Sequence, residues 1–320
     1  MIKKNLSALF LTLASITFAL IICEIILRVK HNIIPNYDIE MWRYAKELKL
    51  KVEFDNINHI HFKNKSSVLQ KVEIKTNSYG QRDINYDNNY LNKFDKSFLI
   101  IGSSIPLGWG VEKEKTFAHL LNIESKKKGK KWIFINGGVG NYNASRYVNN
   151  YLKYWKDLDF THIIITYFVN DAEILQSKKT NFLVKHTHTG VVLWKLYNSF
   201  NSSLKKENLT DYYKNIYSDN SQGFRIAKKE LMKINDHCIL NNIKCILMNM
   251  PDIHQLNPYK LDFINKKISN FSNEINLEYL DLLTLFENID EKKVWNKYQD
   301  PHPNAYAHAM IAKKIFDYLN

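Results

Sequence analysis

The stretch Phe98-Leu99-Ile100-Ile101-Gly102-Ser103-Ser104-Ile105-Pro106 decides the fold of this chain of 320 residues. Its apolar half is typical of a buried strand, and that strand stops abruptly at Gly-Ser-Ser. An open parallel α/β sheet presents a nucleophile in this way, because the chain turns tightly where a strand ends and leaves a hydroxyl at the carboxyl edge. We therefore expect a sheet edge that carries Ser103 or Ser104, with Ser104 favoured.

Strands and helices alternate along the rest of the chain. We expect strands at 98–102, 132–136, 162–167, 243–250 and 277–280. We expect helices at 116–127, 145–155, 224–240, 261–274 and 305–319. This alternation predicts a three-layer α/β/α fold with a parallel sheet covered on both faces. Residues 175–222 do not fit the alternation and are interpreted as an insertion, with a helix around 191–204.

An acid and an imidazole stand close together near the end of the chain, in Asp300-Pro301-His302-Pro303-Asn304. A serine hydroxyl is a poor nucleophile at neutral pH and needs a base within hydrogen-bond reach, itself oriented by a third group. A serine early in the chain followed by an Asp/His pair is one of the recurrent orders of a Ser-His-Asp triad. Ser104, His302 and Asp300 are therefore the predicted nucleophile, base and orienting acid.

Four short motifs resemble the sequence blocks of the SGNH hydrolases, the GDSL-type esterases, over residues 94–320. They are Gly102-Ser103-Ser104 for the Gly-Asp-Ser block, Asn136-Gly137-Gly138, Asn170-Asp171, and Asp300 with His302. The resemblance implies a flavodoxin-like fold and a serine esterase or O-acyltransferase. It also implies an oxyanion hole made by the backbone N–H groups of Ser104 and Gly138 and the side-chain amide of Asn170.

The chain departs from the family pattern at two places. Ser103 stands where the family usually has Asp, and one residue separates Asp300 from His302 where many members have two. The first departure leaves open a catalytically silent member that binds glycan in the cell envelope. The second leaves open a Ser-His dyad aided by a backbone carbonyl. Some membrane-anchored relatives also carry Asn-x-x-Gly-x-Arg, matched here by Asn77, Gly80 and Arg82, which we interpret as structural.

The amino-terminal segment from Leu6 to Leu27 is apolar apart from small hydroxyl residues and Glu24. About 20 such residues are enough to span a bilayer as a helix. A cleavage site of small residues is poorly matched, so we expect an uncleaved single-pass anchor with the body of the protein outside the cytoplasm. The predicted domains are an anchor at 1–30, a linker with a small strand-rich extension at 31–93, and the catalytic domain at 94–320.

The charge, the histidine spacing and the cysteine count bear on three questions: nucleic-acid binding, metal binding and disulfide bonding. The net charge is +13, but the lysines are scattered and no recognition motif accompanies them, so no nucleic-acid partner is expected. His186 and His188 lack neighbours at metal-ligand spacing, and we expect no metal and no cofactor. The three cysteines exclude a disulfide scaffold. Cys238 and Cys245 are predicted to be either a disulfide or, preferably, two separately buried thiols.

The anchor and the family resemblance together predict action on O-acyl groups, above all O-acetyl groups, of cell-envelope or exported glycans. Hydrolysis and acyl transfer share one acyl-enzyme and stay open, as does the oligomeric state. A lipase or lysophospholipase at the membrane surface is the alternative, with an acylated lipid as the substrate. Aromatic residues of the insertion suit sugar stacking, although core packing is the commoner role for such residues: Trp194, Tyr197, Tyr212, Tyr213 and Tyr217.

Overall fold

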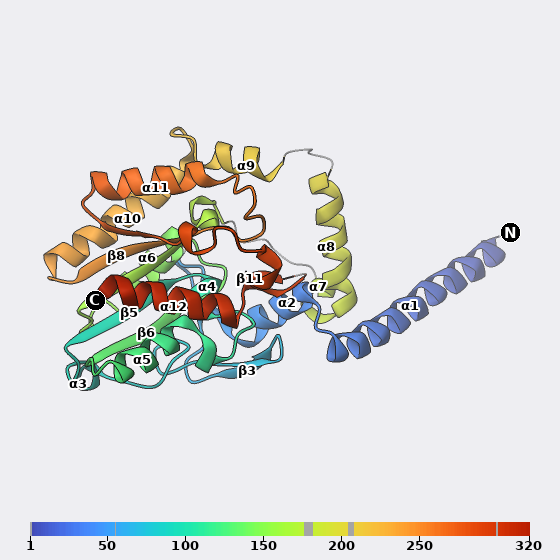
Figure 1. The fold of residues 1–320 in the computed structure, drawn as a ribbon. Helices are drawn as coiled ribbons and strands as arrows, with labels where there is room; N and C mark the ends of the chain where they lie inside the picture. The colour runs from blue at the N-terminus through green and yellow to red at the C-terminus, as the bar shows by residue number, and fades with distance from the viewer. Residues whose placement is uncertain (1, 55, 176–181, 204–207, 299) are drawn as a thin grey trace. The chain divides into compact units, whose positions relative to one another are not determined.

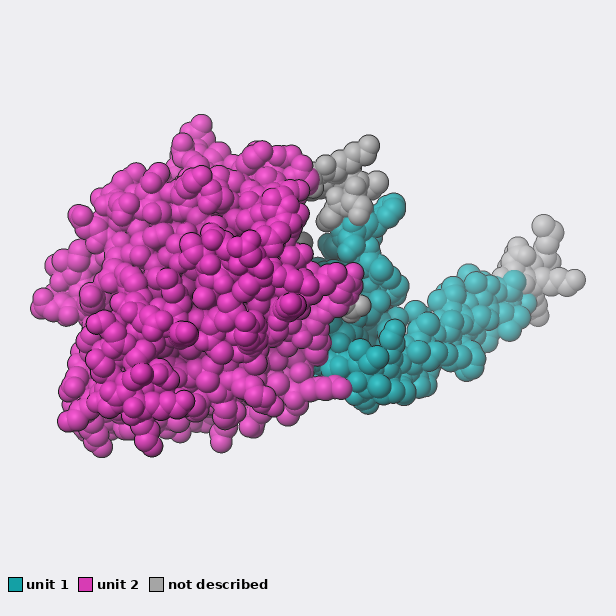
Figure 2. Space-filling view, in the orientation of Figure 1, with its two compact units in different colours: residues 1–46, 177–206 teal, residues 47–176, 207–320 magenta. Residues whose placement is uncertain are grey.

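The computed structural model describes residues 2–54, 56–175, 182–203, 208–298 and 300–320. It divides into two compact units, drawn in different colours in Figure 2. Unit 1 combines residues 1–46 with 177–206, and unit 2 combines 47–176 with 207–320. Every predicted catalytic residue belongs to unit 2. The sequence predicts boundaries after residues 30 and 93, between the anchor, the linker and the catalytic domain. These boundaries stay a prediction.

The centre of unit 2 is a five-stranded parallel sheet (Figure 1). Its strands are β5 (Lys96–Gly102), β6 (Trp132–Gly138), β7 (His162–Phe168), β8 (Lys244–Met250) and β9 (Glu278–Asp281). They lie in the order β6-β5-β7-β8-β9, which is the flavodoxin-like order, and the predicted fold is confirmed. The order reverses beside β5, so a crevice is expected beyond the carboxyl ends of β5 and its neighbours.

Helices cover both faces of this sheet (Figure 1). Phe98 and Ile100 of β5 join the core under α5 (Phe117–Lys127) and α12 (Ala305–Leu319). Leu99 and Ile101 point to the other face, because successive side chains of a strand alternate. That face packs against three helices, α6 (Ala144–Tyr154), α10 (Gln222–Leu240) and α11 (Asp262–Glu274). A strand buried on both faces therefore appears in the sequence as one continuous apolar run.

Smaller elements complete unit 2. Two antiparallel pairs precede the sheet, β1 (Lys49–Lys51) with β2 (His59–His61) and β3 (Ser66–Leu69) with β4 (Val72–Lys75). A third antiparallel pair, β10 (Trp295–Lys297) with β11 (Asp300–Pro303), precedes α12. The short helices are α3 (Asn88–Leu91), α4 (Ser104–Leu107), α9 (Leu209–Ile216), η1 (Lys113–Lys115), η2 (Val169–Ala172), η3 (Leu283–Leu285) and η4 (Glu291–Lys293).

Arg82 ties the segment before the sheet to the turn that follows Ser104. Arg82 is 1% exposed, and its guanidinium donates to the carbonyl oxygens of Leu107, Gly108 and Val111 at 2.8–2.9 Å. The same group donates to the Glu73 carbonyl in β4 at 2.7 Å. Asn77 shapes the preceding turn, since its Oδ1 accepts from two backbone N–H groups. The Asn-x-x-Gly-x-Arg motif is therefore a brace for the loop that carries the predicted nucleophile.

We expect Arg82→Lys to destabilise the protein by about 3 kcal/mol or more, because an ammonium cannot reach four carbonyl oxygens and each one left without a donor costs about 1–3 kcal/mol. Urea unfolding measures this loss. Arg225→Lys on α10 is the control, since it makes the same chemical change outside this brace. Equal stability of the two variants would contradict the bracing role.

Unit 1 contains α1 (Ile2–Ile33), α2 (Tyr37–Glu47), α7 (Phe182–His186) and α8 (His188–Ser203). Among the described residues, α1 alone is long and apolar enough over Ser7–Ile33 to cross a membrane. A signal sequence has the same length and composition, so the uncleaved anchor and its orientation stay predictions. The predicted helix of the insertion corresponds to α8, and it groups with α1 in this unit.

Candidate active site

Ser104 is the first residue of α4, directly after β5. The turn requires glycine at position 102, where φ is +151° and an added Cβ would lie 2.9 Å from both the Pro106 side chain and the Thr166 carbonyl oxygen. Ser103 is buried, whereas Ser104 is partly exposed. A residue at the first turn of a helix has no intrahelical partner for its N–H, so the backbone of Ser104 keeps a donor at the sheet edge.

Three predicted residues form a continuous hydrogen-bonded chain. Ser104 Oγ lies 2.9 Å from His302 Nε2, and His302 Nδ1 lies 2.5 Å from Asp300 Oδ1. An ionised carboxylate only accepts hydrogen bonds, so Nδ1 carries the proton and Nε2 has a lone pair for the Ser104 hydroxyl. The structure thus brings together side chains that are 198 positions apart in the sequence. This is the relative geometry that a Ser-His-Asp triad requires.

Asp300 is buried, and it is held ionised by its neighbours. Burial alone would raise the pKa of Asp300, but hydrogen bonds from His302 and Asn296, together with the charge of His302, lower it below its usual value. Asn296 Nδ2 donates to Oδ2 at 3.2 Å, and the backbone N–H of His302 donates to Oδ1 at 3.4 Å. Asp300 therefore remains a charged acceptor for the imidazole down to acidic pH.

Asn170 lies on η2, just beyond the carboxyl end of β7, the strand next to β5. Its Oδ1 is buried with no hydrogen-bond partner among the described residues, so the surrounding protein does not use this end of the amide. Asp171 holds this helical turn in place, because its Oδ2 accepts from the Tyr147 hydroxyl and the Phe168 N–H, both at 3.0 Å. Burial raises the pKa of Asp171 well above its usual value.

Gly138 lies at the carboxyl end of β6, and its predicted role as an oxyanion donor stays a prediction. Its N–H donates to Asn136 Oδ1 at 3.0 Å. The glycine is needed for packing, because an added Cβ would lie 2.2 Å from the backbone nitrogen of Leu107. A residue with a side chain here would push α4, and Ser104 with it, away from β6. The Ser104 N–H and the Asn170 amide are the other two predicted donors at this edge.

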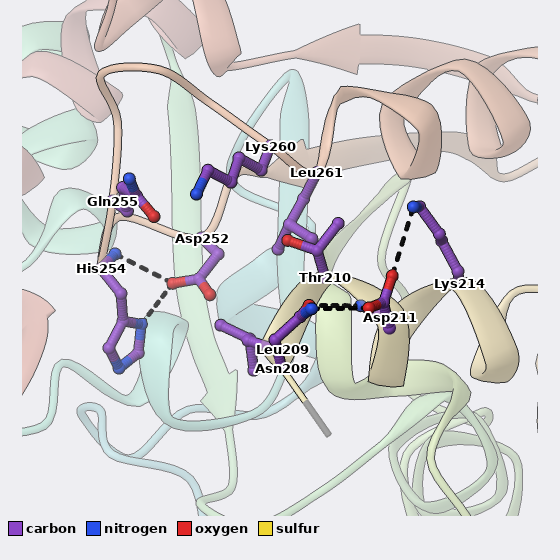
Figure 3. Close-up of a pocket in the computed structure, with 10 residues that line it drawn as sticks. All are labelled: Asn208, Leu209, Thr210, Asp211, Lys214, Asp252, His254, Gln255, Lys260 and Leu261. Carbon is purple, nitrogen blue, oxygen red and sulfur yellow. Dashed lines mark hydrogen bonds and ion pairs between the residues drawn. The ribbon is translucent and has the colours of Figure 1, made fainter. Parts of the chain in front are cut away.

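Sequence reasoning missed a second polar group beside the triad. A pocket of about 500 Å³ is lined in part by Asp252, His254 and Lys260, from the segment between β8 and α11. Figure 3 shows these residues. Asp252-Ile253-His254 has the same Asp-x-His spacing as Asp300-Pro301-His302. That repeated spacing, directly after a strand that ends at the same sheet edge, is the signal that could have found it.

No metal or disulfide site is evident in the described part of the chain. No group of three or more His, Cys, Asp or Glu side chains is placed there to hold a metal ion. Cys238 and Cys245 are two free buried thiols, and Cys23 is free and exposed on α1.

No protein-family model matches the chain, and no curated protein is similar to it. Solved structures do resemble it. The esterase EstA from Pseudoalteromonas sp. is 14% identical with a TM-score of 0.46, over 70% of this chain and 97% of that one. A putative lipolytic protein of the G-D-S-L family from Desulfitobacterium hafniense is 13% identical with a TM-score of 0.45, over 70% and 99%.

A variant of Axe2, an acetylxylan esterase from Geobacillus stearothermophilus, is 12% identical with a TM-score of 0.46, over 70% and 94%. The neighbours in fold include the GDSL type that the sequence resembles. These TM-scores are below 0.5, so the neighbours carry no argument about the mechanism or the substrate of this chain.

Proposed function

We propose that this chain is a serine esterase that removes O-acyl groups, chiefly O-acetyl groups, from glycans. The observation that carries the proposal is the hydrogen-bonded chain from Ser104 Oγ through His302 to Asp300. The acetyl group and the glycan come from the family resemblance in the sequence. The pocket beside the triad supports a hydrophilic substrate over the lipid of the alternative function, since most residues that line it are polar or charged.

In the first step, Ser104 Oγ attacks the ester carbonyl carbon while His302 Nε2 takes the hydroxyl proton. Asp300 stabilises the resulting imidazolium. The carbonyl oxygen becomes an oxyanion, to which the Ser104 N–H and the Asn170 amide donate. The tetrahedral intermediate collapses, the proton on Nε2 passes to the leaving sugar hydroxyl, and an acyl-serine remains. Water, or a second hydroxyl in the case of transfer, then attacks the acyl-serine with His302 again as base.

A fluorophosphonate probe tests this proposal, because it reacts only with an activated serine. We expect the wild-type protein to be labelled at Ser104, and Ser104→Ala to be unlabelled. Ser103→Ala is the matched control and should still be labelled. Labelling that is lost in Ser103→Ala and kept in Ser104→Ala would move the nucleophile by one residue. No labelling of the wild-type protein would favour a silent glycan-binding member.

Asn170→Ala should reduce kcat for ester hydrolysis by about 10²- to 10³-fold with little change in KM, because an oxyanion donor acts mainly in the transition state. Steady-state kinetics with an aryl acetate measure the effect. Asn273→Ala, which makes the same change at an exposed position of α11, is the control. A raised KM with unchanged kcat would place Asn170 in ground-state binding instead.

We also propose that α1 anchors the protein in a membrane with unit 2 outside the cytoplasm. Its length and apolar composition support this, as does the exposure of its large apolar side chains. The proposal places the esterase where envelope or exported glycans are found.

A further inference from the structure

Asp252 and His254 form a second hydrogen-bonded acid–imidazole pair that the mechanism above does not use. His254 Nδ1 is hydrogen-bonded to Asp252 Oδ1, and the backbone N–H of His254 donates to the same oxygen at 3.0 Å (Figure 3). The Asp252 carboxyl is 6% exposed, whereas the His254 side chain is 56% exposed. The acid is therefore buried in the scaffold, and the imidazole keeps its Nε2 for a ligand.

The two Asp-x-His turns are joined directly. Trp295 Nε1 donates to the carbonyl oxygen of Ile253, between Asp252 and His254, at 2.6 Å. Trp295 belongs to β10, where it pairs with Pro303 of β11, the strand that carries His302. The hydrogen bond and charge of Asp252, and the charge of Asp300, raise the pKa of His254 despite its partial burial. The pocket is thus a close neighbour of the reacting ester.

Of the cationic side chains that line the pocket, Lys260 alone has no ion pair with a residue that the structure describes. Lys214 is paired with Asp211 at 3.3 Å, and His254 with Asp252. No hydrogen bond or ion pair is found for the Lys260 ammonium within the described residues. The uncharged polar side chains of the lining can bond hydroxyl groups: Asn208, Thr210 and Gln255.

We propose that this pocket binds an anionic sugar unit of the acylated substrate, with Lys260 facing its carboxylate or phosphate and His254 donating a hydrogen bond to it. The inference rests on the proposed esterase function and names the class of glycan on which it acts. A uronic acid and a sugar phosphate offer the same charge, so substrates of both kinds are needed to separate them.

The test compares wild type with Lys260→Gln and His254→Gln on four acetyl esters. Two are neutral, 1-naphthyl acetate and an acetylated xylo-oligosaccharide, and two are anionic, an acetylated oligogalacturonide and an acetylated hexose phosphate. We expect either variant to lower kcat/KM for at least one anionic ester about tenfold through KM, and to leave the neutral esters within twofold. Lys126→Gln, on α5 at the opposite edge of the sheet, is the matched control for charge.

Equal effects of Lys260→Gln on neutral and anionic esters, or no effect on either, would overturn the anionic subsite. Failure of the esterase proposal has a different signature, since the wild-type protein would then hydrolyse no ester, including 1-naphthyl acetate. Equilibrium binding of the oligogalacturonide and the hexose phosphate to wild type and to Lys260→Gln then tests the pocket without turnover.

An independent observation concerns α8 in unit 1, which exposes a row of large apolar side chains. Leu193, Leu196, Tyr197 and Phe200 are 51–66% exposed and follow the spacing of one helical face. Trp194 beside them is also exposed. Large apolar surfaces of this kind on a protein mark contact with a partner or a membrane.

The first turn of α8 is bound to α1 through Glu24. Its carboxylate accepts from the backbone N–H groups of His188 and Thr189 at 3.1 and 2.8 Å, and from the Thr189 hydroxyl at 2.8 Å. Arg28 donates to it at 2.8 Å. A carboxylate in an apolar helix is costly unless it is paired, and here a helix amino terminus satisfies it. The acidic residue of the predicted anchor thus fixes α8 at the carboxyl-terminal part of that anchor.

We propose that α8 lies in the membrane interface beside the end of α1, with its apolar row in contact with lipid. This rests on the proposed anchor. The occupant is a bilayer because α8 is hydrogen-bonded to a helix of membrane-spanning length, and because Tyr197 in the row and Trp194 beside it are the aromatic types that favour the interface.

The test uses the environment-sensitive fluorophore NBD on cysteine in phosphatidylcholine nanodiscs with and without brominated lipid. Cys238 and Cys245 are buried, so labelling of the wild type reports on Cys23 in α1. In a Cys23→Ser background, Phe200→Cys reports on α8 and Lys126→Cys is the soluble control. We expect quenching at positions 23 and 200 and none at 126. Quenching at 23 without quenching at 200 overturns the α8 proposal, and no quenching at 23 overturns the anchor.

Discussion

Ser104→Ala and His302→Ala should each reduce kcat/KM for an aryl acetate by about 10⁵-fold or more, and the double variant should lose no more than either single one. Nucleophile and base act as one unit, so removing one leaves nothing for the other to do. The 2.9 Å contact between Ser104 Oγ and His302 Nε2 is the physical basis for this expectation. Steady-state hydrolysis measures it, and thermal unfolding shows whether each variant is folded.

Asp300→Asn should cost less, about 10⁴-fold, because the amide can donate to Nδ1 and so favours the wrong tautomer of His302. A Ser-His dyad aided by a backbone carbonyl predicts instead that Asp300→Asn retains most activity. Ser103→Ala serves as the control for the turn itself. If the Ser103 and Ser104 variants both stay active, the protein is not a serine esterase.

The parallel sheet was predictable because four of its five strands, β5 to β8, are buried on both faces. Such strands are mostly apolar runs that end at Gly, or shortly before Asn or Pro, and the predicted strand at 98–102 differs from β5 only by two residues at its start. The β10–β11 pair was not predicted. It is short and irregular, and β11 contains two prolines, so neither an apolar run nor an alternation marks it as a strand.

The site was predictable in its residue types and less so in its hydrogen bonds. Gly138 matches a family motif, but the sequence cannot tell that its N–H donates to Asn136, two residues earlier. The aromatic residues of the insertion also differ in burial, which the sequence did not predict. Tyr213 and Tyr217 are buried, whereas Trp194 and Tyr197 are exposed. Spacing alone does not separate these outcomes, because each depends on segments that are distant in the sequence.

The grouping of α1 with α8 could not be predicted from the sequence either. In the sequence, Glu24 is an isolated charge near the end of an apolar segment. Its partner, Thr189, is 165 positions later, in a region where neither strand nor helix alternation continues. Long-range hydrogen bonds of this kind follow from the folded structure, since no local pattern encodes them.

The free energy of unfolding should fall as the pH is lowered from about 6.5, and His308 should account for one proton of this dependence. His308 is completely buried, and its Nδ1 accepts the backbone N–H of Phe117 at 3.2 Å. Burial, together with the charges of Arg82 and His302, lowers the pKa of His308 to about 3. In the unfolded chain its pKa returns to about 6.5. Between these values the unfolded state binds the proton and the folded state does not, so stability is complete above pH 6.5 and decreases below it.

Each pH unit in that window is worth about 1.4 kcal/mol, so His308 costs the folded state about 4 kcal/mol by pH 3.5. An asparagine side chain would keep an acceptor for the Phe117 N–H without titrating, so His308→Asn should unfold with a shallower dependence on pH. Urea unfolding of both proteins at pH 7, 6, 5 and 4 measures the difference in slope. His59 and His61, whose pKa values burial also lowers, are common to both proteins and cancel in that difference.

We expect the His308→Asn variant to be less stable than the wild type at pH 7, since it loses the ring stacked on Phe117. The difference in stability should become smaller as the pH falls. Parallel pH profiles would mean that the folded protein accommodates a protonated His308.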